Sequence, residues 1–68
     1  MTNLKGIREE RDLTQVELST MAGVSERSIK RWEQGKPISI PNLIKVAKAL
    51  DTTTDKILGL DNKEGAEQ

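Results

Sequence analysis

The chain has 68 residues and contains neither cysteine nor histidine. This length allows one domain with a small core, and the composition excludes disulfides and zinc sites built from cysteine or histidine. The numbers of basic and acidic residues are equal, 11 each, which predicts modest rather than strong nonspecific attraction to nucleic acid.

Two helices are predicted in the first third of the chain. Over residues 3–11, Leu4 and Ile7 are spaced as on one helical face, and Asp12 tolerates the left-handed backbone that ends a helix. A second helix follows Thr14, which forms a capping box with Glu17. The expected cap of the first helix is Thr2 or Asn3, and the expected apolar face of the second is Leu18, Met21 and Ala22.

A third helix is predicted from the cap Ser25 to about Gln34. Ile29 and Trp32 share one of its faces, and the basic side chains lie mostly around the rest. Gly23 suits the end of the second helix, because glycine accepts a positive φ there. Only three residues, Gly23, Val24 and Ser25, separate the second helix from the third, which is the connection of a helix-turn-helix.

Two further helices complete the prediction. The fourth begins at Ser39 or Ile40, with Pro41 in its first turn. Thr53 caps a short fifth helix that Gly59 ends. The expected apolar residues are Leu43, Val46, Ala47 and Leu50 in the fourth helix, and Ile57 and Leu58 in the fifth. The result is an all-α domain of five helices.

The chain divides into a helical domain, residues 1–60, and an acidic tail, residues 61–68. The tail has no apolar periodicity, so we expect it to be disordered. It holds one lysine against three acidic residues, and removing it leaves ten basic and eight acidic residues. The domain without its tail is therefore weakly positive, and the positive charge concentrates in residues 24–36.

The sequence also bears on where the protein is located and on whether it is an enzyme. No apolar run approaches the roughly 18 residues of a membrane span, and the N-terminus lacks the apolar core of a signal peptide. We therefore expect a cytoplasmic protein that makes no membrane contact. The sequence has no glycine-rich phosphate loop, and it is too short to enclose a substrate pocket. We expect neither enzyme activity, nor a cofactor, nor a bound metal.

The segment LTQVELSTMAGVSERSIKRWEQGK, residues 13–36, resembles the lambda-repressor-like or Cro-type helix-turn-helix family, also called the xenobiotic-response-element family. The resemblance continues into IPNLIKVAKALDTTTDKILGL and covers about residues 4–60. It implies a five-helix lambda-repressor-like domain whose third helix enters the DNA major groove while the second crosses above it. The chain departs from the usual family residues at Ser19, Asp51 and Thr54.

The resemblance also points to individual DNA-binding residues. Arginine presents a rigid fork that matches guanine O6 and N7, and a carboxylate can accept from cytosine N4. The base-reading candidates are Glu26, Arg27 and Arg31. The candidates for phosphate contact or bracing are Gln15, Ser28, Lys30, Gln34 and Lys36. For Arg27, Arg31, Gln15 and Lys30 the alternative is a solvated surface side chain, and for Glu26 it is a favourable charge at the helix N-terminus.

Three other side chains are predicted to hold the third helix on the core. Trp32 either packs in the core or stacks on bases, and its place beside Ile29 favours the core. The family often pairs an arginine of the first helix with a glutamate at the end of the third. Arg8 and Glu33 occupy those positions here, so an ion pair is expected, with two independent exposed charges as the alternative.

The predicted function is sequence-specific binding of double-stranded DNA, as a repressor that occupies an inverted-repeat operator as a homodimer. The resemblance places the dimer contact within residues 38–60, with Leu58 and Leu60 as its apolar contributors. The alternative is that both leucines cover the core of their own domain. We expect so small a contact to give a dimer that is weak in free solution and forms mainly on DNA. The alternative is an antitoxin-like regulator whose main partner is another protein. Only the acidic tail favours that alternative.

Overall fold

The computed structural model describes residues 2–60, which form five α-helices and no strand. The predicted all-α, five-helix class is therefore confirmed for this part of the chain. The predicted disorder of residues 61–68 lies outside the described residues. The helices are α1 (Leu4–Glu10), α2 (Gln15–Ala22), α3 (Glu26–Glu33), α4 (Ile40–Ala49) and α5 (Thr54–Leu58).

Four helices begin at the hydroxyl side chains that the sequence predicts. The caps are Thr14, Ser25, Ser39 and Thr53, and each accepts a hydrogen bond from a backbone N–H in the first turn. At α2 the capping box is complete: Glu17 N donates to Thr14 Oγ1 at 3.0 Å, and Thr14 N donates to Glu17 Oε1 at 2.8 Å. These local bonds fix where each helix starts.

The start of α1 differs from the prediction. Asn3 is the N-cap residue, but its side chain makes no capping hydrogen bond. Its backbone N–H instead donates to the carbonyl oxygen of Ile57 at 2.7 Å, and the Thr2 hydroxyl donates to the carbonyl oxygen of Trp32 at 3.2 Å. Long-range bonds to α5 and α3 therefore hold this helix end in place of a side-chain cap.

A residue with left-handed backbone lies at or just past the end of each helix, as predicted for Asp12, Gly23 and Gly59. Gly23 and Gly59 have φ of 74° and 76°, and Asp12 and Asp51 have φ of 56° and 53°. Aspartate tolerates this region better than most residues with a Cβ. The departure at Asp51 therefore leaves the turn between α4 and α5 intact.

One core contains residues from all five helices. Its buried apolar members are Leu4, Ile7, Leu18, Ala22, Ile29, Trp32, Leu43, Val46, Ala47, Leu50 and Ile57. The prediction that Met21 belongs to the core is wrong, because its side chain is 56% exposed. In α2 the buried face is centred between Leu18 and Ser19, which turns Met21 towards solvent. The hydroxyl of the buried Ser19 donates to the carbonyl oxygen of Val16 at 2.7 Å.

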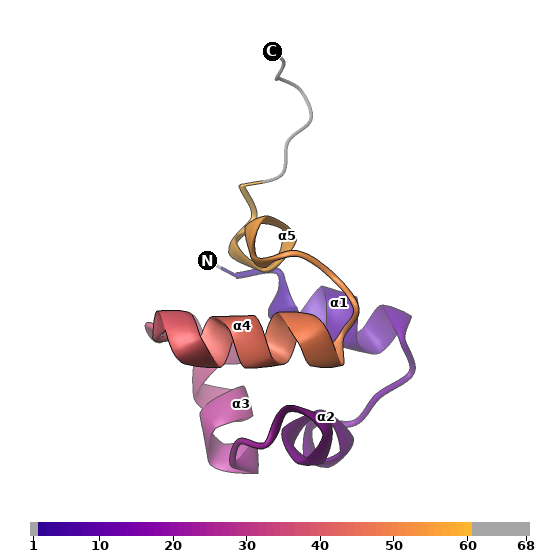
Figure 1. The fold of residues 1–68 in the computed structure, drawn as a ribbon. Coiled ribbons are helices and arrows are strands. Elements are labelled where there is room, and N and C mark those ends of the chain that lie inside the picture. Colours follow the sequence, from indigo (N-terminus) through magenta and orange to yellow (C-terminus); the bar gives the residue numbers. More distant parts are fainter. Residues whose placement is uncertain (1, 61–68) are drawn as a thin grey trace.

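Figure 1 shows α2 and α3 below α4, and α5 above it. The helix-turn-helix pair and the α5 end of the domain thus lie on opposite sides of α4 (Figure 1). Among the helices of residues 2–60, none combines the length and the apolar character that crossing a membrane requires.

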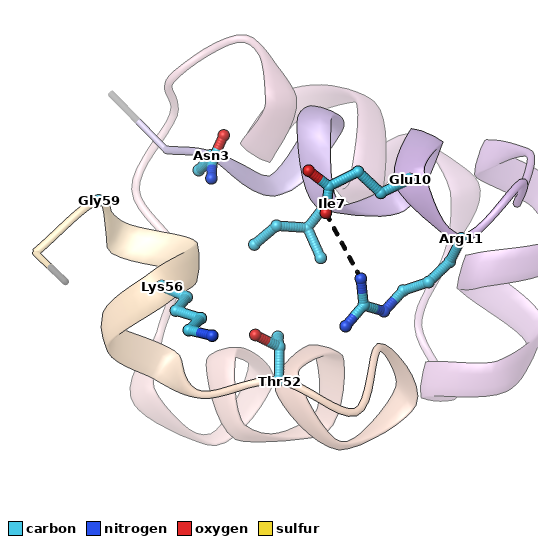
Figure 2. A pocket seen from close by; sticks show the side chains of 7 residues that line it. All are labelled: Asn3, Ile7, Glu10, Arg11, Thr52, Lys56 and Gly59. Carbon is cyan, nitrogen blue, oxygen red and sulfur yellow. Dashed lines mark ion pairs between the residues drawn. The ribbon is translucent and has the colours of Figure 1, made fainter. Parts of the chain in front are cut away.

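Arg11 closes the corner between α4 and α5. Its Nε donates to the carbonyl oxygen of Leu50 at 2.5 Å, and its Nη2 donates to that of Asp51 at 3.5 Å. A groove of about 280 Å³ lies beside this corner, between α1 and α5 (Figure 2). There Glu10 faces the Arg11 guanidinium, with 3.6 Å between Oε1 and Nη1 (Figure 2). Arg11 therefore forms its polar contacts within the domain.

Candidate nucleic-acid interface

The third helix has one buried face and one exposed face. Ile29 is fully buried and Trp32 is 7% exposed, so both belong to the core, as predicted for Trp32. Arg27 and Arg31 lie on the opposite side of the helix and are exposed. The buried tryptophan cannot stack on bases, and it fixes the orientation of the basic side chains.

Arg27 and Arg31 form a row with i, i+4 spacing along the exposed face of α3. Neither side chain forms an ion pair with any group in residues 2–60. Two like charges at this spacing destabilise a helix by a few tenths of a kcal/mol. An exposed row of this kind is instead suited to an anionic partner, because arginine forks match phosphate and guanine acceptors.

A second row lies beside the first. Lys30 Nζ is 3.6 Å from Glu26 Oε2, and the two side chains are 53% and 43% exposed. The sequence predicts Glu26 as a base-reading residue and Lys30 as a phosphate contact, and the pair between them is not among the predictions. Their i, i+4 spacing, with the acidic residue first, was the signal for it.

A buried polar network fixes the C-terminal end of α3. Arg8 Nε donates to Glu33 Oε2 at 2.6 Å, and Arg8 Nη2 donates to Glu33 Oε1 at 3.2 Å. The exposed fractions of the two side chains are 10% and 5%. A third Arg8 donor, Nη1, reaches the carbonyl oxygen of Leu13 at 2.7 Å. The predicted Arg8–Glu33 pair is confirmed.

The hydrogen bond from Arg8 to Glu33 raises the pKa of the Arg8 guanidinium above its ordinary value, and the Glu33 charge adds to this. Burial acts in the opposite direction but is the weaker influence. Arg8 therefore stays charged, and the bidentate pair joins α1 to α3.

Gln15 joins α2 to the same network. Its side-chain amide donates to Glu33 Oε1 at 3.0 Å. The sequence left two roles open for Gln15, phosphate contact and bracing of α3, and the described hydrogen bond is the bracing one. It places the first residue of α2 beside the last residue of α3. Contact between Gln15 and a phosphate stays a prediction.

The remaining candidates flank α3. The Ser28 hydroxyl accepts from the Ser25 hydroxyl at 2.9 Å and is half-buried. Gln34 is the C-cap residue and is exposed, as is Lys36. Gly35, with φ of 96°, turns the chain so that Lys36 N donates back to the carbonyl oxygen of Arg31 at 3.1 Å. The structure thus gathers these side chains around one helix.

A family model described as helix-turn-helix, of the Cro/C1 type, matches residues 4–57, which are most of the chain. The chain belongs to the Cro/C1-type helix-turn-helix family. Comparison with curated proteins finds none that matches. This family consists of DNA-binding regulatory domains and is not typically enzymatic, so the protein is a DNA-binding transcription regulator. In the described residues, α2 and α3 are the two helices of the motif.

Proposed function

We propose that this protein is a transcriptional repressor that binds a specific inverted-repeat operator as a homodimer. The observation that carries the proposal is the exposed Arg27–Arg31 row, free of ion pairs within residues 2–60, on a helix held by a buried tryptophan and a buried ion pair. A cytoplasmic location, where the protein would meet DNA, is part of the proposal.

In this proposal α3 lies in the major groove, which admits an α-helix and presents a different donor and acceptor pattern for each base pair. Arg27 and Arg31 read guanine, and Glu26 accepts from cytosine N4. Phosphate contacts fix the register of the helix without reading sequence. They come from Gln15, Ser28, Lys30, Gln34 and Lys36.

Repression needs no further domain, because a bound protein blocks polymerase by occupying its site. One α3 reads only a few base pairs, so a second copy supplies the rest of the specificity. The dimer contact is assigned to the α5 end of the domain. Leu60 is 66% exposed there, whereas Leu58 is half-buried against the core of its own domain. The antitoxin-like alternative rests on residues 61–68, outside the described part of the chain.

Titration of duplex DNA at several salt concentrations tests the proposal. The logarithm of affinity should fall linearly with the logarithm of salt concentration, with a slope of roughly −0.9 for each phosphate contact. We expect about four contacts per subunit from the basic and polar side chains around α3. Failure to bind duplex DNA even at low salt would contradict the proposal.

A further inference from the structure

The two parallel rows on α3 differ in charge. The Arg27–Arg31 row carries two positive charges, whereas the Glu26–Lys30 row is a closed ion pair with no net charge. Ser25 caps the helix through a hydrogen bond from Ser28 N at 3.1 Å, so the backbone under Glu26 is fixed without help from its carboxylate. The ion pair that the carboxylate forms within residues 2–60 is the one with Lys30, at 3.6 Å.

We propose that Glu26 determines specificity through Lys30, by withholding this lysine from phosphates unless a matched base pair engages the carboxylate. This inference rests on the proposed DNA-binding function and assigns a role to one pair within it. On unmatched DNA the Glu26 carboxylate stays beside Lys30 and offsets part of the lysine charge that the phosphates meet. Lys30 then binds phosphates less strongly, so it displaces fewer counterions and nonspecific affinity is reduced.

On a matched site, cytosine N4 donates to Glu26 and releases Lys30 to a phosphate. Both side chains are about half exposed, so both can change rotamer without disturbing the core. An exposed ion pair of this kind is weak, and a well-placed hydrogen bond to a base edge is stronger. A matched base can therefore open the pair. An unmatched base offers the carboxylate no donor, and the phosphates nearby repel it.

The first part of the proposal is that Glu26 keeps Lys30 from phosphates on unmatched DNA. Salt titration of the wild type and of Glu26→Gln on a duplex of random sequence tests it. Glutamine keeps the size of the side chain but removes the charge that holds Lys30. We expect the slope of log affinity against log salt to become steeper by about 0.9 per subunit, the value of one added phosphate contact. Thermal melts of both proteins confirm that the variant is folded.

Lys30→Met supplies the matched control. In that background Glu26→Gln has no lysine to release, so the slope should stay unchanged. Equal steepening with and without Lys30 would show that Glu26 acts only as a negative charge, and this overturns the inference. An unchanged slope for Glu26→Gln in both backgrounds overturns it too, because Lys30 would then never be withheld.

The second part of the proposal is that a matched base pair releases Lys30 to a phosphate. Salt titration on a duplex selected by the wild-type protein tests it. The wild-type slope should be steeper on the selected site than on random duplex by about 0.9 per subunit, and Glu26→Gln should remove this difference. A difference that persists in Glu26→Gln overturns the inference. These outcomes are separable from failure of the proposed function, which would appear as no binding by the wild type itself.

Discussion

Arg8 belongs to a polar network that connects three helices through the Glu33 carboxylate. It pairs with Glu33 at the end of α3, reaches the carbonyl oxygen of Leu13, and shares Glu33 with Gln15 of α2. The pKa of Arg8 is raised, so its contribution to stability is present throughout neutral pH and would be lost only as pH rises past the folded-state value. The charge that Arg8 contributes to this network is therefore unchanged around neutral pH.

Arg8→Met should destabilise the domain strongly, because it leaves the Glu33 carboxylate buried without its cation. Breaking a fully buried ion pair lowers the free energy of unfolding by about 3–5 kcal/mol. Arg8→Met combined with Glu33→Leu should be less destabilised than Arg8→Met alone. Urea unfolding followed by circular dichroism measures both. Lys30→Met breaks the exposed pair on α3 and should cost at most about 1 kcal/mol. A double variant no more stable than Arg8→Met would contradict the buried-pair account.

Arg27→Ala and Arg31→Ala separate base reading from phosphate binding. Each should cost about 1–3 kcal/mol of binding free energy on the preferred site and relax the preference at one base pair. Lys36→Ala should weaken binding to all sequences similarly and make the salt slope shallower by about 1. Binding to a panel of single-base variants of the site measures these effects. If both arginine variants kept the wild-type preference, α3 would not be the reading helix.

At the scale of elements, most helix boundaries were predictable because they depend on neighbouring residues. A hydroxyl cap bonds within one turn, and Gly23 or Asp12 supplies the left-handed residue at a helix end. The start of α1 was not predictable in this way, since Asn3 bonds to Ile57, far along the chain. The exposure of Met21 was missed too, because α2 has a narrow buried face that spacing alone did not locate.

In the candidate site, too, some contacts could be predicted from the sequence and others could not. Arg8, Glu33 and Gln15 were identified through the family resemblance, and the structure brings them together. The Glu26–Lys30 pair had a local signal that our interpretation of the sequence did not use. Arg11 had no such signal, because its acceptors, the carbonyls of Leu50 and Asp51, become neighbours only when the fold is complete.

Gly6→Ala should stabilise α1. Alanine is favoured over glycine by about 1 kcal/mol in a helix interior. A Cβ at Gly6 would meet Asn3 Oδ1 at 2.9 Å, but the exposed Asn3 side chain makes no capping bond and can turn away. The control is Gly23→Ala, where φ of 74° should make alanine destabilising by roughly 1–2 kcal/mol. Thermal melts compare the two, and a loss of stability in Gly6→Ala would show that Asn3 is fixed.

At the scale of the whole described domain, α3 and α5 lie on opposite sides of α4, so the proposed DNA-reading helix is separate from the proposed dimer contact (Figure 1). Leu60→Asp should leave the monomer folded, because this side chain is 66% exposed. It should reduce cooperative binding to a duplex with two half-sites, since a charge in an apolar dimer contact is costly. Gel-shift titrations with one and two half-sites measure the cooperativity. Equal wild-type affinity for both duplexes would show that the protein acts as a monomer.

The central claim is that two copies of α3 read a specific DNA sequence, and selection from random duplex DNA tests it most directly. The wild-type protein should enrich an inverted repeat whose half-site centres are about 10 base pairs, or roughly 34 Å, apart. A parallel selection with Arg27→Ala and Arg31→Ala should lose part of that preference. Enrichment of no common sequence, or of one that both variants also select, would contradict the claim.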